Sequence, residues 1–294
     1  MSTPLIALVH SRIRVEERLL CEEMSRRNIA FELIDLRTAS WNLHEVGAWN
    51  RFDAVLDRSV SQTQGIAAVR IFERFGIPCV NPSDVIDVCG DKLRTSLALE
   101  REGVPTPHTR VALDPESALS VIEDMGYPVV LKPVIGSWGR LLTRVNDRDC
   151  AESILEHKAT LGSVQHGVYY IQEFINKPDR DLRVFMAGDE PLCGIRRDSA
   201  HWITNTARGG RASAFTPDDS VCELCRRASR AVGGGLLAID LLECPTRGML
   251  VSEVNHTMEF RNSIEPTGVD IPARIIDWTL HASRTRSACA GVVS

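Results

Sequence analysis

Apolar runs and amphipathic stretches alternate along the first part of the chain. The apolar runs predict strands at residues 5–10, 30–36, 52–59 and 77–81. The stretch at residues 16–28 has helical periodicity, and a second helical stretch at residues 63–76 ends on a glycine. This alternation of strands and helices predicts a small parallel sheet covered by helices, and we expect the unit to end near residue 90.

The pattern changes after residue 90, where strand patterns follow one another across short polar turns. Helices are predicted at residues 91–103, 147–162, 218–233 and 272–283, and strands at residues 128–134, 141–145 and 167–175. Residues 181–197 are typical of a hairpin that turns at Gly188 and Asp189. These features predict antiparallel sheets. Residues 284–294 are small and polar, which predicts a frayed tail.

A second hairpin is predicted from two apolar runs, residues 236–243 and 251–260, that are joined by a turn. Residues two apart in a strand point the same way, so Glu253 and Asn255 share a face, and the hairpin could bring Asp240 close to them. Two carboxylates and an amide oxygen suit Mg²⁺, which takes its other ligands from water and phosphates. A solvent-facing edge strand explains the same pattern equally well.

Two lysines and a glycine-containing loop are candidates for phosphate binding. Lys132 lies inside an apolar strand, where an ammonium group needs an anionic partner. The loop after it, residues 135–140, has glycines at 136 and 139, which let backbone N–H groups approach phosphate oxygens. The glycine spacing of a Walker loop is absent, so a simple hairpin turn remains the alternative. Lys92 begins a predicted helix, where a solvated lysine is also common.

The end of the strand at 167–175 has features of a nucleoside site. Gln172 and Glu173 end the strand and Asp181 follows. Backbone groups at a strand end can contact the edge of an adenine, and an acidic residue can accept hydrogen bonds from ribose hydroxyls.

Two arginine-containing segments are candidates for anion binding. Residues 201–213 form a polar, glycine-rich segment that carries Arg208, and arginine can hold a carboxylate or phosphate bidentately. A flexible surface loop is the alternative explanation. Arg261 and Asn262 follow the strand that carries Glu253 and could join the same site.

Composition narrows the class of protein. With 44% hydrophobic and 25% charged residues and a net charge of −5, the chain is typical of a globular protein without general affinity for nucleic acid or anionic membranes. The nine cysteines are an odd number and are scattered, which favours free thiols in a reducing cytoplasm. Cys222 and Cys225 form a single CxxC, and we expect packing there, not structural zinc.

Taken in order, these features resemble the ATP-grasp carboxylate–amine ligases over residues 1 to about 280. Within that superfamily the chain is most similar to the RimK/LysX group, and in particular to its lysine-biosynthesis ligases. The motifs that carry the resemblance are KPVIGSWGR, SAHWITNTARGG, SEVNHTMEFRNS and TGVDIP.

The resemblance implies an α/β architecture in which two α+β subdomains of an ATP-grasp fold clamp ATP. The implied parts are a parallel-sheet preATP-grasp domain (1–89), a central subdomain (90–165), a C-terminal subdomain (166–283) and a tail (284–294).

The resemblance also implies a role for each candidate residue. Phosphates would be bound by Lys92 and Lys132 and covered by Gly136, Ser137, Trp138 and Gly139. Adenine would be framed by Gln172, Glu173, Phe174 and Ile175, with ribose at Asp181. Two Mg²⁺ ions, or Mn²⁺ in their place, would be bound by Asp240, Glu253 and Asn255. The substrates would contact Asn205, Thr206, Arg208, Arg261 and Asn262, and the catalytic residues would be Lys132 and Arg208.

The implied reaction joins a carboxylate to an amine at the expense of ATP, through an acyl phosphate. In the lysine branch the carboxylate is the C-terminal glutamate side chain of an acidic LysW-like carrier protein, and the amine is α-aminoadipate. The alternatives are the glutamate–carrier ligase of arginine biosynthesis and a RimK-like glutamate ligase that acts on a ribosomal protein. A nucleotide-binding regulator without turnover is a further alternative. Neither nucleic acid nor membrane is an expected partner, and a cytoplasmic homo-oligomer is expected.

An acidic carrier needs a basic surface on a chain that is acidic overall. Arginines cluster in the sequence near the proposed site, at positions 196, 197, 208, 211 and 261. We expect Arg196, Arg197 or Arg211 to contact the carrier at the mouth of the site, although a solvated arginine group explains the same pattern.

Overall fold

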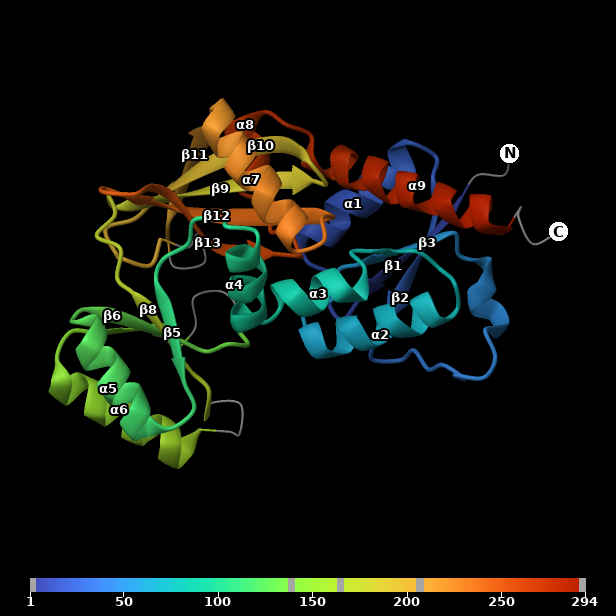
Figure 1. Ribbon diagram of the computed structural model, residues 1–294. Helices are drawn as coiled ribbons and strands as arrows, with labels where there is room; N and C mark the ends of the chain where they lie inside the picture. The colour runs from blue at the N-terminus through green and yellow to red at the C-terminus, as the bar shows by residue number, and fades with distance from the viewer. Residues whose placement is uncertain (1–3, 137–140, 163–166, 205–208, 291–294) are drawn as a thin grey trace.

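The strands in the described part of the chain form three sheets that lie in separate lobes (Figure 1). The structure is a computed structural model and describes residues 4–136, 141–162, 167–204 and 209–290. The N-terminal lobe is a four-stranded parallel sheet, and the other two lobes are built on antiparallel sheets. The predicted change from parallel to antiparallel pairing is therefore confirmed.

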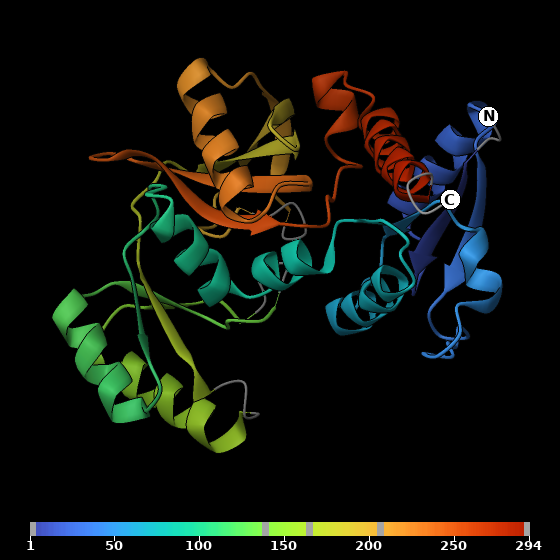
Figure 2. The same ribbon diagram turned by 45° about the vertical axis from the view of Figure 1, so that its right-hand side comes forward.

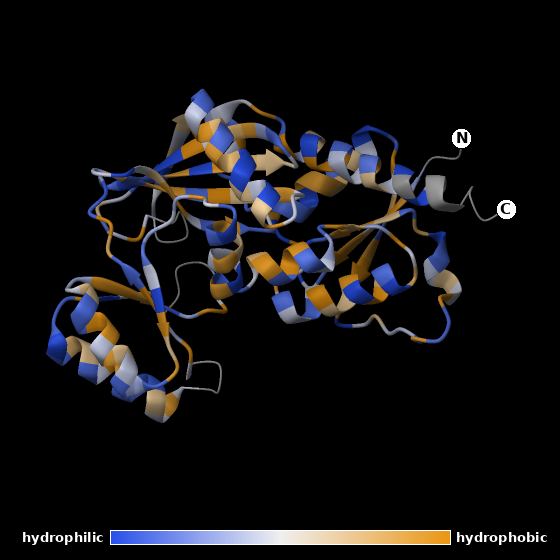
Figure 3. Ribbon diagram, in the orientation of Figure 1, coloured by the Kyte–Doolittle hydropathy of each residue, from blue (hydrophilic) through white to orange (hydrophobic). Residues whose placement is uncertain are grey.

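The N-terminal sheet has the strand order β2-β1-β3-β4. Its strands are β1 (Leu5–His10), β2 (Ala30–Asp35), β3 (Ala54–Asp57) and β4 (Cys79–Val80). The connecting helices are α1 (Val15–Arg26), the 3₁₀ helix η1 (Gly47–Arg51) and α2 (Gln62–Arg74), and α3 (Ser83–Cys89) leads out of the lobe. β1 and β3 are buried nearly throughout, as their continuous apolar runs predict (Figure 3).

The central lobe has the strand order β5-β8-β6-β7. Its strands are β5 (Thr109–Ala112), β6 (Val129–Lys132), β7 (Thr143–Val145) and β8 (Tyr169–Glu173). Helices α5 (Pro115–Met125) and α6 (Arg148–Leu161) pack into one core with the sheet, and α4 (Lys92–Arg101) precedes it. Because β8 pairs with β5 and β6, the central sheet extends to Glu173, beyond the boundary that we placed at residue 165.

The C-terminal lobe is a five-stranded sheet with the order β11-β10-β9-β12-β13. Its strands are β9 (Arg180–Ala187), β10 (Glu190–Asp198), β11 (Arg211–Phe215), β12 (Leu236–Cys244) and β13 (Gly248–Asn255). Helix α7 (Asp219–Ala231) packs on one face of this sheet. The chain ends with α8 (Ile264–Thr267) and α9 (Ile271–Ala290), so residues 284–290 continue a helix and the expected frayed tail is wrong there. Among the described residues, no helix combines the length and apolarity needed to cross a membrane.

One hydrophobic core joins the N-terminal and C-terminal lobes. Leu8 of β1 and Met24 of α1 are buried with Phe185 of β9, Leu236 of β12 and Ile275 of α9. Figures 1 and 2 show α9 lying beside α1 and the N-terminal sheet, while the central lobe stands apart from them. Helix α7 therefore covers one face of the C-terminal sheet, and the opposite face packs in part against the N-terminal lobe.

Asn81 adds a polar connection between the same two lobes. This buried side chain follows β4, and its Nδ2 donates hydrogen bonds to Leu236 O and His256 O, both at 2.8 Å. Its Oδ1 accepts a bond of 2.7 Å from Leu236 N. One amide thus satisfies three backbone groups, at the start of β12 and just after the end of β13.

The Asn81→Ala substitution is expected to lower the free energy of unfolding by at least about 3 kcal/mol, because each buried group left without a partner costs about 1–3 kcal/mol. Urea denaturation followed by circular dichroism measures this loss. Asn42→Ala is the matched control, since Asn42 Oδ1 accepts a single exposed bond from His44 N. Equal effects of the two substitutions would contradict the role of Asn81.

Candidate active site

A cavity of about 430 Å³ lies between the central sheet and the C-terminal sheet. Lys132 of β6, Arg144 of β7 and Gln172 of β8 line it from one side. Asp240 of β12 and Glu253 of β13 line it from the other side. The two antiparallel sheets therefore face each other across a space that carries cations and carboxylates from both.

The start of α4 fixes Lys92 at one end of this cavity. The Asp91 side chain caps the helix by accepting from Leu93 N and Arg94 N, and Lys92 N donates to Val134 O at 2.8 Å. Lys92 Nζ lies 3.3 Å from Glu253 Oε1 and donates to Gly136 O at 2.7 Å. A lysine that sequence alone left open as a solvated side chain is thus held in the cavity by a carboxylate of the opposite sheet.

Lys132 extends from β6 to the same hairpin, where its Nζ lies 3.5 Å from Ser252 Oγ. Burial lowers the pKa of Lys132 to about 8, because it disfavours the charged ammonium, and the nearby Glu253 carboxylate only partly offsets this effect. Lys132 thus interacts electrostatically with the Glu253 carboxylate, while its hydrogen-bond contact is the Ser252 hydroxyl.

The hairpin formed by β12 and β13 pairs Asp240 directly with Glu253. The predicted hairpin, with these two residues opposite each other, is confirmed. Asn255 lies two residues further along β13, opposite Ala238, where its Nδ2 donates to Ala238 O at 3.5 Å. Within the described part of the chain, no three His, Cys, Asp or Glu side chains gather as a metal site. A hard cation held by this hairpin would need water or phosphate for its remaining ligands.

Asp240 belongs to a buried network of four charged side chains on the cavity face of the sheet. Arg183 binds it bidentately, with distances of 2.7 and 2.8 Å, and Arg197 approaches it to 3.2 Å. Burial alone would raise the pKa of Asp240, but the guanidinium groups of Arg183 and Arg197 outweigh this effect and hold the pKa below its ordinary value. Asp240 is therefore ionised, and three positions of its carboxylate are already taken by the two arginines.

Asp181 is the fourth member of this network. Arg197 binds both of its carboxylate oxygens, at 2.6 and 2.8 Å, and Thr204 donates a hydrogen bond to it from Oγ1. Asp181 was predicted to hold ribose, and it does line the cavity. Because a carboxylate offers about four lone-pair positions, three of which are used here, only limited accepting capacity is left for a ribose hydroxyl.

An aromatic group closes the other end of the cavity. The guanidinium carbon of Arg144 lies 4.1 Å from the ring centroid of Phe174, and the Trp202 ring meets Phe174 edge-on at 6.2 Å. Gln172 donates to Thr109 Oγ1, and Glu173 pairs with Arg247. Both polar side chains are thus bound within the protein, which leaves the backbone after β8 and these flat groups to contact a planar base.

Several predicted site residues lie elsewhere. Arg261 and Asn262 are exposed after β13, outside the cavity lining. Six predicted site residues lie outside the described residues: Ser137, Trp138, Gly139, Asn205, Thr206 and Arg208. Cys225 packs in the core beneath α7.

The expectation that Arg197 contacts a carrier at the mouth of the site is wrong. Only 2% of its side chain is exposed, because it is bound to Asp181 and Asp240 in the interior. Arg196 is exposed. Because neighbouring residues of a strand point to opposite faces of the sheet, Arg196 lies on the face that α7 covers, opposite to Arg197. There it stands opposite Ser213 of β11. Arg211 pairs with Asp198 on that same face.

Some residues of the site had no role among the sequence predictions, and Arg144, Arg183 and Trp202 are examples. Arg183 could have been found from strand alternation, since it stands two positions after Asp181 and therefore on the same face of β9. Arg144 and Trp202 come from a strand and a loop whose contacts with Phe174 depend on the tertiary fold.

Two antiparallel sheets that close on a cavity of lysines and carboxylates define the class of ATP-grasp ligases. A solved RimK-domain ATP-grasp protein from Sphaerobacter thermophilus superimposes with a TM-score of 0.77 at 27% identity, covering 94% of this chain and 99% of that chain. A model of the LysX preATP-grasp domain matches residues 6–88, and a model of the RimK-like ATP-grasp domain matches residues 89–279.

The chain belongs to the RimK-like ATP-grasp family. The glutamate–LysW ligase ArgX of Sulfurisphaera tokodaii is 32% identical over 275 residues, which cover 93% of this chain and 97% of the relative. The α-aminoadipate–LysW ligase LysX of the same organism is 33% identical over 277 residues, with 92% and 96% covered. The protein is accordingly an ATP-dependent ligase that forms amide bonds.

Arg197→Met is expected to lower the free energy of unfolding by about 3–5 kcal/mol, because it leaves two buried carboxylates with too few cations. Arg196→Met, at the adjacent exposed position, should change it by less than about 0.5 kcal/mol. Denaturant unfolding of the two variants measures the difference. A small effect at position 197 would show that the buried network does not stabilise the fold.

Proposed function

We propose that this ligase joins the α-amino group of α-aminoadipate to the C-terminal glutamate side chain of an acidic, LysW-like carrier protein, as part of lysine biosynthesis. The lysine-ligase motifs in the sequence support this choice of amine. Glutamate is the alternative amine, because the two LysW ligases compared here, which use different amino acids, are 33% and 32% identical to the chain. The two amines differ by one methylene, worth about 1–3 kcal/mol in a pocket.

The observation that carries the proposal is the cavity in which Lys92 and Lys132 face Asp240 and Glu253. Lysines from the central sheet side would bind the phosphates of ATP, and the hairpin carboxylates with Asn255 would bind one or two Mg²⁺ ions. Phe174, Arg144 and Trp202 would surround the adenine. These donor types fit the ligands, since Mg²⁺ prefers carboxylate and phosphate oxygens and a guanidinium stacks on flat rings.

The proposed reaction has two steps. The carrier's terminal carboxylate attacks the γ-phosphorus of ATP, ADP leaves, and an acyl phosphate forms. The amine then attacks the acyl carbon, phosphate leaves with the electron pair of the broken C–O bond, and the amine loses a proton as the amide forms. Lys132 and Arg208 would stabilise charge on the transferred phosphoryl group. Magnesium, when bound, would neutralise charge on the phosphates.

Glu253→Gln is expected to lower ADP release at least about 100-fold, because one of the cavity's two hairpin carboxylates loses its charge. The assay combines the enzyme, a LysW-like carrier and either α-aminoadipate or glutamate, and it measures ADP and the carrier's mass. Glu243→Gln, in the same hairpin but paired with Arg180, is the control that should keep its activity.

The same assay tests the proposed substrates. An increase in carrier mass by one α-aminoadipate residue supports the proposal, and an increase by one glutamate residue favours the arginine branch. Turnover with glutamate and a ribosomal protein tail, but not with the carrier, would favour the RimK-like alternative. Full activity of Glu253→Gln would contradict the assignment of the hairpin as the metal site.

ATP affinity is expected to fall as the pH rises through about 8, the value to which burial lowers the pKa of Lys132. Below this pH the protonated side chain attracts phosphate, and above it the side chain is neutral. Lys132→Arg stays charged over this range and should flatten the dependence. Isothermal titration of ATP at several pH values measures both proteins, and identical slopes would exclude Lys132 as the titrating group.

A further inference from the structure

A second polar cluster lies at the carboxyl ends of β1 and β3. These parallel strands are neighbours, and the chain leaves β1 toward β2 on one side and comes back to β3 on the other. Ligands of parallel α/β sheets bind outside the carboxyl ends of strands at such a point. His10 ends β1, and Arg58 directly follows β3, with Arg58 N bonded to Val9 O at 2.9 Å.

Arg58 reaches from this edge to the segment that follows β13. Its side chain is 3% exposed. Nε donates to Glu17 Oε1 at 3.1 Å, and Nη1 donates to Met258 O at 3.0 Å. The guanidinium carbon also lies 5.7 Å from the ring centroid of Phe260. The side chain is therefore held in one orientation by both lobes.

The remaining nitrogen of this guanidinium, Nη2, is buried without a hydrogen-bond partner. Within the described residues, five buried side-chain atoms lack a hydrogen-bond partner. Arg58 Nη2 is one of them, and His10 Nδ1, at the end of the neighbouring strand, is a second. An unmet donor on a charged group costs more than about 1–3 kcal/mol. Two unmet polar atoms on adjacent strand ends, at the place where such sheets bind ligands, point to a missing anion.

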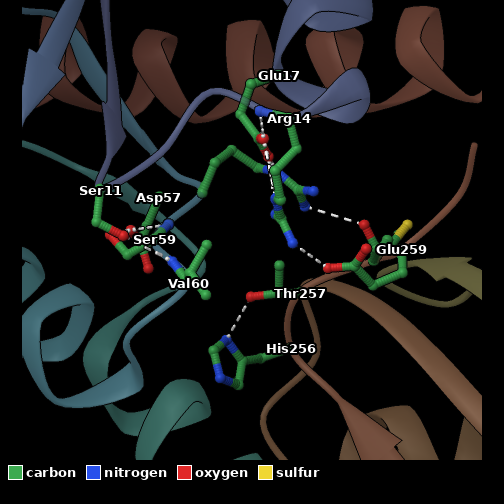
Figure 4. A network of polar contacts seen from close by, with 11 residues as sticks. Ser11, Arg14, Glu17, Asp57, Ser59, Val60, His256, Thr257 and Glu259 are labelled. Atoms are coloured by element: carbon green, nitrogen blue, oxygen red, sulfur yellow. Dashed lines mark hydrogen bonds and ion pairs between the residues drawn. The ribbon is translucent and has the colours of Figure 1, made fainter. Parts of the chain in front are cut away.

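The glutamates of this cluster are already paired with arginines. Glu17 is buried and already accepts from Arg14, at 2.9 Å, as well as from Arg58. Glu259 pairs with Arg14 at 2.5 Å. Figure 4 shows Glu259 and Glu17 gathered around Arg14, with Thr257 and His256 to one side. Burial, reinforced by the charge of Arg58, lowers the pKa of His256 to about 4, so His256 is neutral at physiological pH.

Only a few residues of the chain separate this cluster from the hairpin that lines the cavity. Met258, which Arg58 contacts, is five residues after Glu253, and five extended residues span at most about 17 Å. A ligand bound at Arg58 thus lies within reach of the hairpin that lines the cavity.

We propose that a carboxylate of the amine-bearing amino-acid substrate binds Arg58 Nη2 at the carboxyl ends of β1 and β3. This inference rests on the proposed function and names a substrate contact for it. A dicarboxylic amino acid held there by one carboxylate would present its amine toward the hairpin of Asp240 and Glu253. Arg58 is then a specificity residue, supplied by the N-terminal lobe for a reaction whose ATP site lies between the other two lobes.

The test measures ligand affinity directly, by thermal shift with L-α-aminoadipate, L-glutamate and MgATP. In Arg58→Gln the affinity for the amino acid that stabilises the wild type should fall about 10- to 100-fold, the range for a lost hydrogen bond to a charged group. The affinity for MgATP should stay within about twofold. Arg58→Lys keeps the charge and should lie between. Arg18→Gln, at an exposed position of α1, is the control that should match the wild type.

Two outcomes would overturn the inference. Amino-acid binding that is equal in the wild type and both Arg58 variants would exclude the contact, and parallel loss of amino-acid and MgATP binding would assign Arg58 a purely structural role. A wild-type protein that is stabilised by neither amino acid also contradicts it. If ADP release then occurs with another amine, the protein is still a ligase and only the Arg58 contact is excluded. If an amino acid binds but no ADP is released, the result counts against the proposed function and not against the Arg58 contact.

Discussion

The buried ion pairs on the cavity face of the C-terminal sheet are the constraint on which the rest of the site depends. Arg183, Arg197, Asp181 and Asp240 place two cations and two anions in the interior, and each carboxylate is bound by at least two donors. Removing one of these side chains lowers the free energy of unfolding by more than the net contribution of its ion pairs, because its charged partners remain buried without compensation. The positions of β9, β10 and β12 are thereby fixed relative to one another at the point where the cavity opens.

The hairpin belongs to a sheet that shares a hydrophobic core with the N-terminal lobe. Residues of β1 and α1 pack with β9, β12 and α9, so the N-terminal and C-terminal lobes are joined through apolar burial and not only through surface contacts. Of the residues that the structure describes, the central lobe contributes none to that core, and it has a core of its own. Interfaces between such units permit relative motion unless they are large and apolar. The cavity therefore lies between a fixed pair of lobes and a separately packed third one.

Much of this fold followed from the periodicity of the sequence, because apolar alternation fixes both the strands and the face that each residue takes. The pairing of Asp240 with Glu253 was predicted on that basis and is confirmed. Alternation does not say which sheet a strand joins, which is why β8 lay on the wrong side of a predicted boundary. Nor does it distinguish Arg196 from Arg197, since only the register against β9 decides which one is buried. Arg58 could not be recognised, because its contact with Met258 joins residues 200 positions apart.

The charge arrangement of the cavity has a consequence for how nucleotide can enter. Lys92 is already paired with Glu253, and Asp240 with two arginines. Under the proposed function, binding a cation and a polyphosphate together would exchange partners: Lys92 would turn from the Glu253 carboxylate to a phosphate, and the cation would take its place at the hairpin. Each exchange would replace one ion pair with another. A polyphosphate entering without its cation would instead set its own charge against Glu253 and Asp240. The pairing seen here therefore favours binding of the metal–nucleotide complex over either component alone.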